Sequence, residues 1–126
     1  MAKKKILIVD DEENFARLVK LNLERTGNYE VRAEYQGVKA IVAAREFKPN
    51  LILLDILMPG MDGGKVAEMI RNDKNLEDIP IVFLTAATTK KEVSSHDGII
   101  GGRPFIAKPV SVEELISCIE KNLKIK

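Results

Sequence analysis

The stretch Leu51-Ile52-Leu53-Leu54-Asp55-Ile56-Leu57-Met58-Pro59-Gly60-Met61-Asp62-Gly63 decides the fold. Four consecutive aliphatic residues lead directly into an aspartate, and proline and glycine then break the chain. An unbroken apolar run of this length predicts a strand buried on both faces, as in a parallel sheet. Asp55 would then lie at the carboxyl end of a central strand, which is where open α/β sheets bind their ligands. We therefore expect Asp55 to be functional, whereas Asp62 suits the start of the next helix.

Four further strands are predicted, two before this stretch and two after it. Continuous apolar runs occupy 6–9, 81–84 and 105–107, and residues 29–35 alternate as an exposed edge strand does. Helices are expected in the intervals and after the last strand, with 89–96 the weakest of them. Three glycines in 98–102 predict the least ordered part of the chain. Strands that alternate with helices predict one domain over 1–126, with a parallel sheet covered on both faces.

Helical periodicity predicts which side chains of these helices face the sheet. In the first helix, Phe15, Leu18 and Val19 recur at helical spacing, and in the helix after Gly63 the inward residues are expected to include Met69. Ser111 and Glu114 have the spacing of a capping box at the start of the last helix.

Composition excludes several classes of protein. The chain has 126 residues with 20 basic and 19 acidic side chains, a balance that gives no indication of nucleic-acid or membrane partners. No apolar run approaches the ~18 residues of a membrane span. An acidic run at 10–13 stands where a signal peptide would be cleaved. A single cysteine, Cys118, excludes an internal disulfide and fits a reducing compartment, so we expect a cytoplasmic protein.

Polar residues follow four of the predicted strands: Asp10 and Asp11, then Asp55, Thr85 and Lys108. Because the carboxyl ends of parallel strands share one edge of the sheet, we expect these side chains to converge. Three carboxylates repel one another unless a cation lies between them, and Mg²⁺ is held by carboxylates, waters and phosphate oxygens. An ammonium and a hydroxyl beside them suit the oxygens of a phosphoryl group. The set therefore predicts phosphoryl transfer to a carboxylate.

The segments that carry these residues closely resemble the receiver domains of two-component response regulators. The resemblance covers the whole chain, in order and spacing, and is carried by Ile8-Val9-Asp10-Asp11-Glu12, by residues 54–63, by Leu84-Thr85-Ala86 and by Lys108-Pro109. It implies a flavodoxin-like, doubly wound (βα)5 parallel sheet with strand order 2-1-3-4-5. It also implies a signalling switch, not an enzyme, that takes a phosphoryl group from a histidine kinase or a histidine phosphotransfer protein.

The resemblance further implies roles at the metal and phosphorylation site. Asp55 would be the phosphoacceptor. Asp11 and Asp55 would ligate Mg²⁺ directly, together with the backbone carbonyl of Leu57, and Asp10 would act through water.

The same resemblance implies how the switch works. Thr85 and Lys108 would bind the phosphoryl group, and Pro109 would follow a cis peptide that aims the lysine. Thr85 and Phe105 would move on phosphorylation, although Phe105 lacks the phenol often found at this place. The surface formed by the fourth helix, fifth strand and fifth helix would then change for partner binding or phosphorelay, with an unknown downstream protein as target.

Leu57 and Ala87 each stand two residues past a site residue. Both are apolar and cannot orient an attacking water. We therefore expect slow spontaneous dephosphorylation.

Other interpretations stay open at this point. Asp10 and Asp11 could simply cap a helix, Thr85 could be an ordinary strand end, and Phe105 could be plain core. An aspartate-nucleophile phosphohydrolase is disfavoured because Leu57 stands where its second carboxylate would be. An interaction module without chemistry is disfavoured by the complete set of site residues. The last helix ends the chain, so a stand-alone, chemotaxis-type receiver and a piece of a longer regulator are both open.

Overall fold

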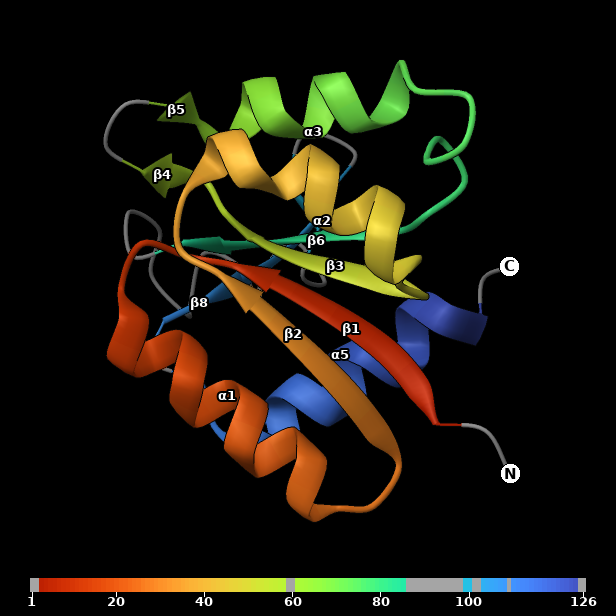
Figure 1. Cartoon of the computed structure of the whole chain (residues 1–126). Helices are drawn as coiled ribbons and strands as arrows, with labels where there is room; N and C mark the ends of the chain where they lie inside the picture. Colours follow the sequence, from red (N-terminus) through yellow and green to blue (C-terminus); the bar gives the residue numbers. More distant parts are fainter. Residues whose placement is uncertain (1–2, 59–60, 86–98, 101–102, 109, 125–126) are drawn as a thin grey trace.

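A parallel sheet forms the centre of the molecule (Figure 1). The computed structural model describes residues 3–58, 61–85, 99–100, 103–108 and 110–124. Five parallel strands lie in the spatial order β2 (Tyr29–Glu34), β1 (Lys4–Val9), β3 (Leu51–Asp55), β6 (Ile81–Thr85) and β8 (Arg103–Ala107). This is the order 2-1-3-4-5 counted over the parallel strands alone, so the predicted fold class is confirmed.

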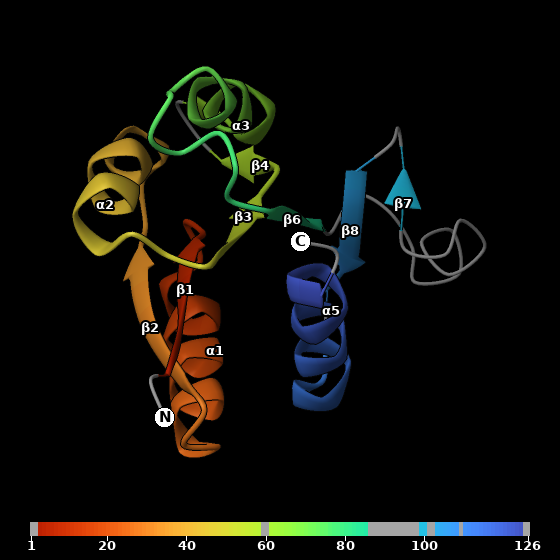
Figure 2. The same ribbon diagram turned by 90° about the vertical axis from the view of Figure 1, so that its right-hand side faces the viewer.

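Helices cover both faces of this sheet (Figures 1 and 2). One face carries α1 (Glu13–Arg25) and α5 (Val112–Lys124), and the other carries η1 (Gly37–Lys39), α2 (Ala40–Phe47) and α3 (Gly63–Arg71). A small hairpin of β4 (Leu57–Met58) and β5 (Met61–Asp62) joins β3 to α3. The helix predicted over 89–96 lies outside the described residues. No helix in the described part of the chain is long and apolar enough to cross a membrane.

The continuous apolar runs of the sequence form the inner strands because both of their faces are covered. Ile6 and Ile8 of β1 face the α1/α5 layer, whereas Leu7 and Val9 face the α2/α3 layer, and all four are fully buried. Each such burial stabilises the fold by roughly 1.5–3 kcal/mol. At the edge, β2 buries Tyr29 and Val31 and exposes residue 30, as its alternation predicts.

Two of the predicted inward residues are on the outside. Leu18 is 56% exposed and Met69 is 49% exposed. Their neighbours Val19 and Ile70 are buried instead. Consecutive residues of a helix are about 100° apart around its axis, so a sheet-facing stripe that includes Val19 turns Leu18 away. Both predictions were wrong because α1 and α3 bury narrower stripes than their apolar residues allow.

In the glycine-rich stretch 98–102, the structure describes only Ile99 and Ile100, and the three glycines lie outside the described residues. Ile99 and Ile100 form β7, which pairs antiparallel with Pro104 and Arg103 of β8 at the edge of the sheet (Figure 2). Predicting such a short strand from two residues requires knowledge of the strand that it pairs with. The capping box is confirmed, since Ser111 N–H donates to Glu114 Oε1 at 3.2 Å and Glu114 N–H to Ser111 Oγ at 3.1 Å.

Candidate functional site

The carboxyl ends of the strands bring the predicted polar residues to one edge of the sheet (Figure 1). Asp10 follows β1, Asp55 ends β3, Thr85 ends β6 and Lys108 follows β8. Backbone bonds fix these ends: Asp10 N–H donates to the Glu34 carbonyl at 3.0 Å, and Lys108 N–H to the Thr85 carbonyl at 2.9 Å. The positions of the site residues are therefore set by the sheet itself.

Three carboxylates meet at this edge. Asp10, Asp11 and Asp55 each offer an oxygen, and these oxygens lie within 4.8 Å of one another. Asp10 and Asp55 are buried, whereas Asp11 is exposed. An all-oxygen set with an open side is what Mg²⁺ takes in proteins, where it usually keeps several waters.

Asp10 uses its two carboxylate oxygens differently. Oδ1 accepts the N–H of Glu12 at 3.0 Å, at the start of α1, so the capping interpretation holds for one oxygen. Oδ2 is buried and has no aligned hydrogen bond within the described residues, although the Lys108 ammonium lies 2.7 Å away as an ion pair. A buried carboxylate oxygen without such a bond fits a site for a hydrated cation. The donor set is thus compatible with Mg²⁺.

Lys108 supplies the positive charge of the site. Its Nζ lies 2.7 Å from Asp10 Oδ2, 2.6 Å from Glu12 Oε1 and 3.7 Å from Asp55 Oδ2. Burial alone would lower the pKa of this ammonium, but the close ion pair with Asp10, the hydrogen bond to Glu12 and the charge of Asp55 outweigh it and raise the pKa. Lys108 therefore stays protonated at neutral pH.

Sequence reasoning missed two neighbours of Lys108. The sequence marks Glu12 only as a member of the acidic run 10–13 and of the receiver motif, and Phe15 only as an apolar residue at helical spacing. The structure places the Phe15 ring centroid 4.6 Å from Lys108 Nζ and bonds Glu12 to the same atom. The position of Glu12 next to Asp10 and Asp11 was a usable signal, because it places a further carboxylate at the same edge of the sheet.

Thr85 and Phe105 lie on adjacent strands. Thr85 is 1% exposed, and it is in register with Ala107 of β8. Phe105 is partly buried against the α2/α3 layer and stacks on Phe83, with ring centroids 5.1 Å apart. Phe105 thus packs in the core of the sheet. It lies two residues before Ala107, the residue of β8 that is in register with Thr85.

Gly63 fixes the chain around Asp55, a role that sequence reasoning did not assign. Its N–H donates to the Ile56 carbonyl at 3.0 Å. A Cβ at this position would lie 2.3 Å from the Asp55 carbonyl oxygen and 2.6 Å from Ile56 Cα. Only glycine lets α3 approach the end of β3 so closely. Of the other predicted site residues, the backbone of Leu57 begins β4, and Pro109 and Ala87 lie outside the described residues.

The chain belongs to the family of response regulator receiver domains, whose family model matches residues 6–120. Among curated proteins, it is 34% identical over 121 residues to the DNA-binding dual master transcriptional regulator RpaA of Synechocystis sp., a match that covers 95% of this chain and 49% of RpaA. The chain thus spans about half the length of that relative.

Solved structures give the same family. The chemotaxis protein CheY4 of Vibrio cholerae superposes with a TM-score of 0.81 at 26% identity, over 96% of this chain and 99% of CheY4. The N-terminal domain of a response regulator receiver protein from Methanoculleus marisnigri superposes with a TM-score of 0.71 at 33% identity, over 95% of this chain and 96% of that domain. This protein is therefore a receiver domain of two-component signalling.

Proposed function

We propose that the chain accepts a phosphoryl group on Asp55 from a phosphohistidine of a kinase or phosphotransfer protein. The observation that carries the proposal is the proximity of Lys108 Nζ, 3.7 Å from Asp55 Oδ2, to a cluster of three carboxylates that fits Mg²⁺. Asp11 and Asp55 would hold the ion together with the Leu57 carbonyl, and Asp10 would bind through water. When bound, the ion supplies positive charge to the phosphoryl oxygens.

The proposed transfer is a displacement at phosphorus. One Asp55 carboxylate oxygen forms the new O–P bond, the N–P bond of the donor breaks, and the imidazole nitrogen keeps the bonding electron pair. Lys108 and the Thr85 hydroxyl donate hydrogen bonds to the phosphoryl oxygens. Hydrolysis then returns Asp55 to the free carboxylate, because water attacks phosphorus and inorganic phosphate leaves.

The lifetime of the phosphorylated state is a further part of the proposal. Leu57 and Ala87 are apolar and cannot orient the water that hydrolysis requires. The substitution Leu57→Asn should therefore shorten the phosphoryl half-life, and an unchanged half-life would contradict this.

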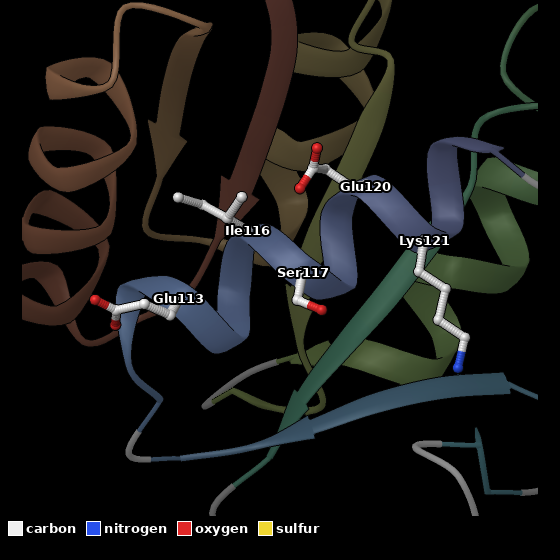
Figure 3. A pocket seen from close by; sticks show the side chains of 5 residues that line it. All are labelled: Glu113, Ile116, Ser117, Glu120 and Lys121. Atoms are coloured by element: carbon white, nitrogen blue, oxygen red, sulfur yellow. The ribbon is translucent and has the colours of Figure 1, made fainter.

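The proposed output surface involves the fourth helix together with β8 and α5. Along α5, Glu113, Ile116, Ser117, Glu120 and Lys121 line a shallow groove of about 580 Å³ (Figure 3). Thr85 and Phe105 would couple Asp55 to this side, since their strands are adjacent. The RpaA match includes only about half of that DNA-binding protein, and this chain is nearly neutral. We propose a cytoplasmic receiver, one unit over 1–126, with protein partners and no direct contact with nucleic acid or membrane.

Incubation with acetyl phosphate and Mg²⁺, followed by intact-mass measurement, tests this function. The wild-type chain should gain one phosphoryl group, and Asp55→Asn or removal of Mg²⁺ with a chelator should abolish the gain. Asp73→Asn is the matched control. It removes a carboxylate of low exposure that lies just after α3 and outside the cluster of three carboxylates, so labelling should remain intact. Failure of the wild type to label would favour an interaction module without phosphorylation chemistry.

A further inference from the structure

Two residues at the start of α1 make a second set of contacts with the ammonium of Lys108. Glu12 Oε1 accepts a hydrogen bond from Lys108 Nζ at 2.6 Å, and the Phe15 ring centroid lies 4.6 Å from the same nitrogen. We propose that Glu12 and Phe15 form a latch that holds Lys108 on the α1 side of the site and competes with a phosphoryl group on Asp55. Glu12 is then a positioning residue that acts through Lys108. The inference rests on the proposed function.

Glu12 occupies the N-cap position of α1, where an acidic side chain would normally cap the helix. It is the residue before α1, with an extended backbone at φ −79° and ψ 92°, and within the described part of the chain its side chain makes no capping bond. Its carboxylate bonds Lys108 instead, 96 residues further along the chain. The contact therefore links α1 to the end of β8, and it is not part of the helix start.

Phe15 completes the latch from the same side of α1. Phe15 lies in the first turn of α1, three residues after Glu12. The backbone bond from Ala16 N–H to the Glu12 carbonyl, at 3.0 Å, fixes this first turn. Phe15 also packs against the α1/α5 core, so its ring has a defined position. A lysine ammonium over an aromatic face is attracted to it, and this attraction adds to the bond with Glu12.

The distances show which partner Lys108 has in this state. Nζ is 2.6 Å from the Glu12 oxygen but 3.7 Å from Asp55 Oδ2, which is beyond hydrogen-bonding distance. The ammonium has three N–H donors, and Glu12 Oε1 and Asp10 Oδ2, 2.6 Å and 2.7 Å from Nζ, hold it on the α1 side of the site. A phosphoryl group on Asp55 therefore competes with both oxygens for the position of this ammonium.

A bound cation would not remove this competition. The oxygens that could hold an ion belong to Asp10, Asp11 and Asp55, and Glu12 is not among them. A cation at that cluster would engage Asp10, the other close partner of Lys108, and leave the bond with Glu12 in place. Glu12 thus acts on the lysine specifically.

The size of the effect follows from exposure. Glu12 has a side-chain exposure of 61%, whereas that of Lys108 is 10%. Ion pairs with one solvated partner contribute modestly, so the latch should change affinity for a phosphoryl group by about two- to five-fold. An effect of this size would change how strongly the phosphorylated state is favoured, but it would not abolish phosphorylation of Asp55.

The test compares Glu12→Gln with Glu13→Gln. Both remove one negative charge from the same turn, but Glu13 pairs with Arg17 at 3.1 Å and not with Lys108. The probe is beryllofluoride with Mg²⁺, an analogue of the phosphoryl group on a carboxylate, with affinity measured by titration calorimetry and by fluorine NMR. Glu12→Gln should bind it about two- to five-fold more tightly than wild type, and Glu13→Gln should equal wild type. Phe15→Leu should shift affinity in the same direction by less.

A second background shows whether Lys108 mediates the effect. In Lys108→Gln, adding Glu12→Gln should leave the weakened beryllofluoride affinity unchanged, because the competing bond is already gone. Equal effects of Glu12→Gln and Glu13→Gln, or weaker binding by Glu12→Gln, would overturn the latch while the proposed function stands. Failure of the wild type to bind beryllofluoride at all would overturn the proposed function, and the latch with it.

Discussion

The two ends of the sheet are built on opposite principles. At the carboxyl end, the largely buried Lys108 ammonium lies 2.7 Å from Asp10 Oδ2 and 3.7 Å from Asp55 Oδ2, both on buried aspartates. Asp10 Oδ2 lacks an aligned hydrogen bond among the described residues. At the amino end, Lys5 and Asn50 close the strands with reciprocal bonds: Lys5 N–H donates to Asn50 Oδ1 at 2.8 Å, and Asn50 N–H to the Lys5 carbonyl at 2.7 Å. One end concentrates charge, and the other satisfies its polar groups locally.

This contrast shows that the fold is less stable at the end of the sheet where its functional residues lie. Like charges in a buried cluster disfavour the folded state unless a ligand or counter-ion offsets them. Satisfied hydrogen bonds at the opposite end contribute to stability without any ligand. Removing a charge at the carboxyl end should therefore stabilise the fold, whereas removing a hydrogen bond at the amino end should destabilise it. The following predictions test this contrast and the packing at the two ends, from the largest effect to the smallest.

The largest effect is expected from a methyl group at Gly63, at the carboxyl end. Gly63→Ala would press Cβ onto the Asp55 carbonyl oxygen, 2.3 Å away, and should lower the free energy of unfolding by about 3 kcal/mol. Chemical denaturation measures this loss, and acetyl phosphate labelling should fall with it. The control is Gly27→Ala near the amino end, where φ is +81° and nothing lies within 4 Å, so only about 1 kcal/mol of strain is expected. Equal losses would contradict the close approach.

Neutralising Asp55 should have the opposite sign. In metal-free buffer, Asp55→Asn relieves repulsion with Asp10 and Asp11 while the Lys108–Asp10 ion pair remains. We expect an increase of about 1 kcal/mol in unfolding free energy. Mg²⁺ should stabilise the wild type by mass action and Asp55→Asn less. Thermal denaturation with and without Mg²⁺ measures both effects. A less stable Asn variant in metal-free buffer would show that the cluster is already neutralised by Lys108.

At the amino end, losing a satisfied bond should cost stability. Asn50→Ala removes the acceptor for the Lys5 N–H and should lower the unfolding free energy by about 1 kcal/mol. Asn50→Asp retains a side-chain oxygen that can accept the Lys5 N–H and should recover most of the loss. Phosphorylation of Asp55 should be unchanged in both variants. If Asn50→Ala is neutral, water replaces the bond and the contrast between the ends is weaker than proposed.

The smallest effect concerns acid pH at the end of α3. Hydrogen bonds from Arg45 and from the Asn75 N–H, together with the Arg45 charge, outweigh burial and lower the pKa of Asp73. A carboxylate with a lowered folded pKa contributes stability above its unfolded value, near 3.9, and loses that contribution as the pH falls through the folded value. Wild type should therefore lose more stability than Asp73→Asn below about pH 4. Urea titrations measure the unfolding free energy of both proteins against pH. The same pH dependence in both would contradict a stabilising Arg45–Asp73 ion pair.

The sheet could be predicted because its signals are local. Runs such as 51–54 and 81–84 are apolar throughout, and only a strand covered on both faces accommodates them. The polar residues that follow these runs could be assigned to one edge before any distance was known. The choice between neighbouring apolar residues in a helix was harder, as Leu18 and Met69 show, because the angle at which a helix lies on the sheet selects them.

The candidate site divides in the same way. Asp10, Asp11, Asp55 and Lys108 could be identified from their positions after strands, and the structure brings them together. Glu12 and Gly63 could not be assigned their contacts, because both depend on how closely separate elements approach. A carboxylate in an acidic run and a glycine at a helix start each have common local explanations.

Apolar periodicity and chain breaks, both visible along the chain, were sufficient to identify the buried strands and the polar residues that end them. The bond between Lys108 and Glu12, the 3.7 Å separation of Lys108 from Asp55 and the close approach of Gly63 to the Asp55 backbone were visible only in the folded molecule. Such distances between residues far apart in the chain are set by strand register and by the way helices pack on the sheet. Neither strand register nor helix packing can be predicted from one segment of the chain alone.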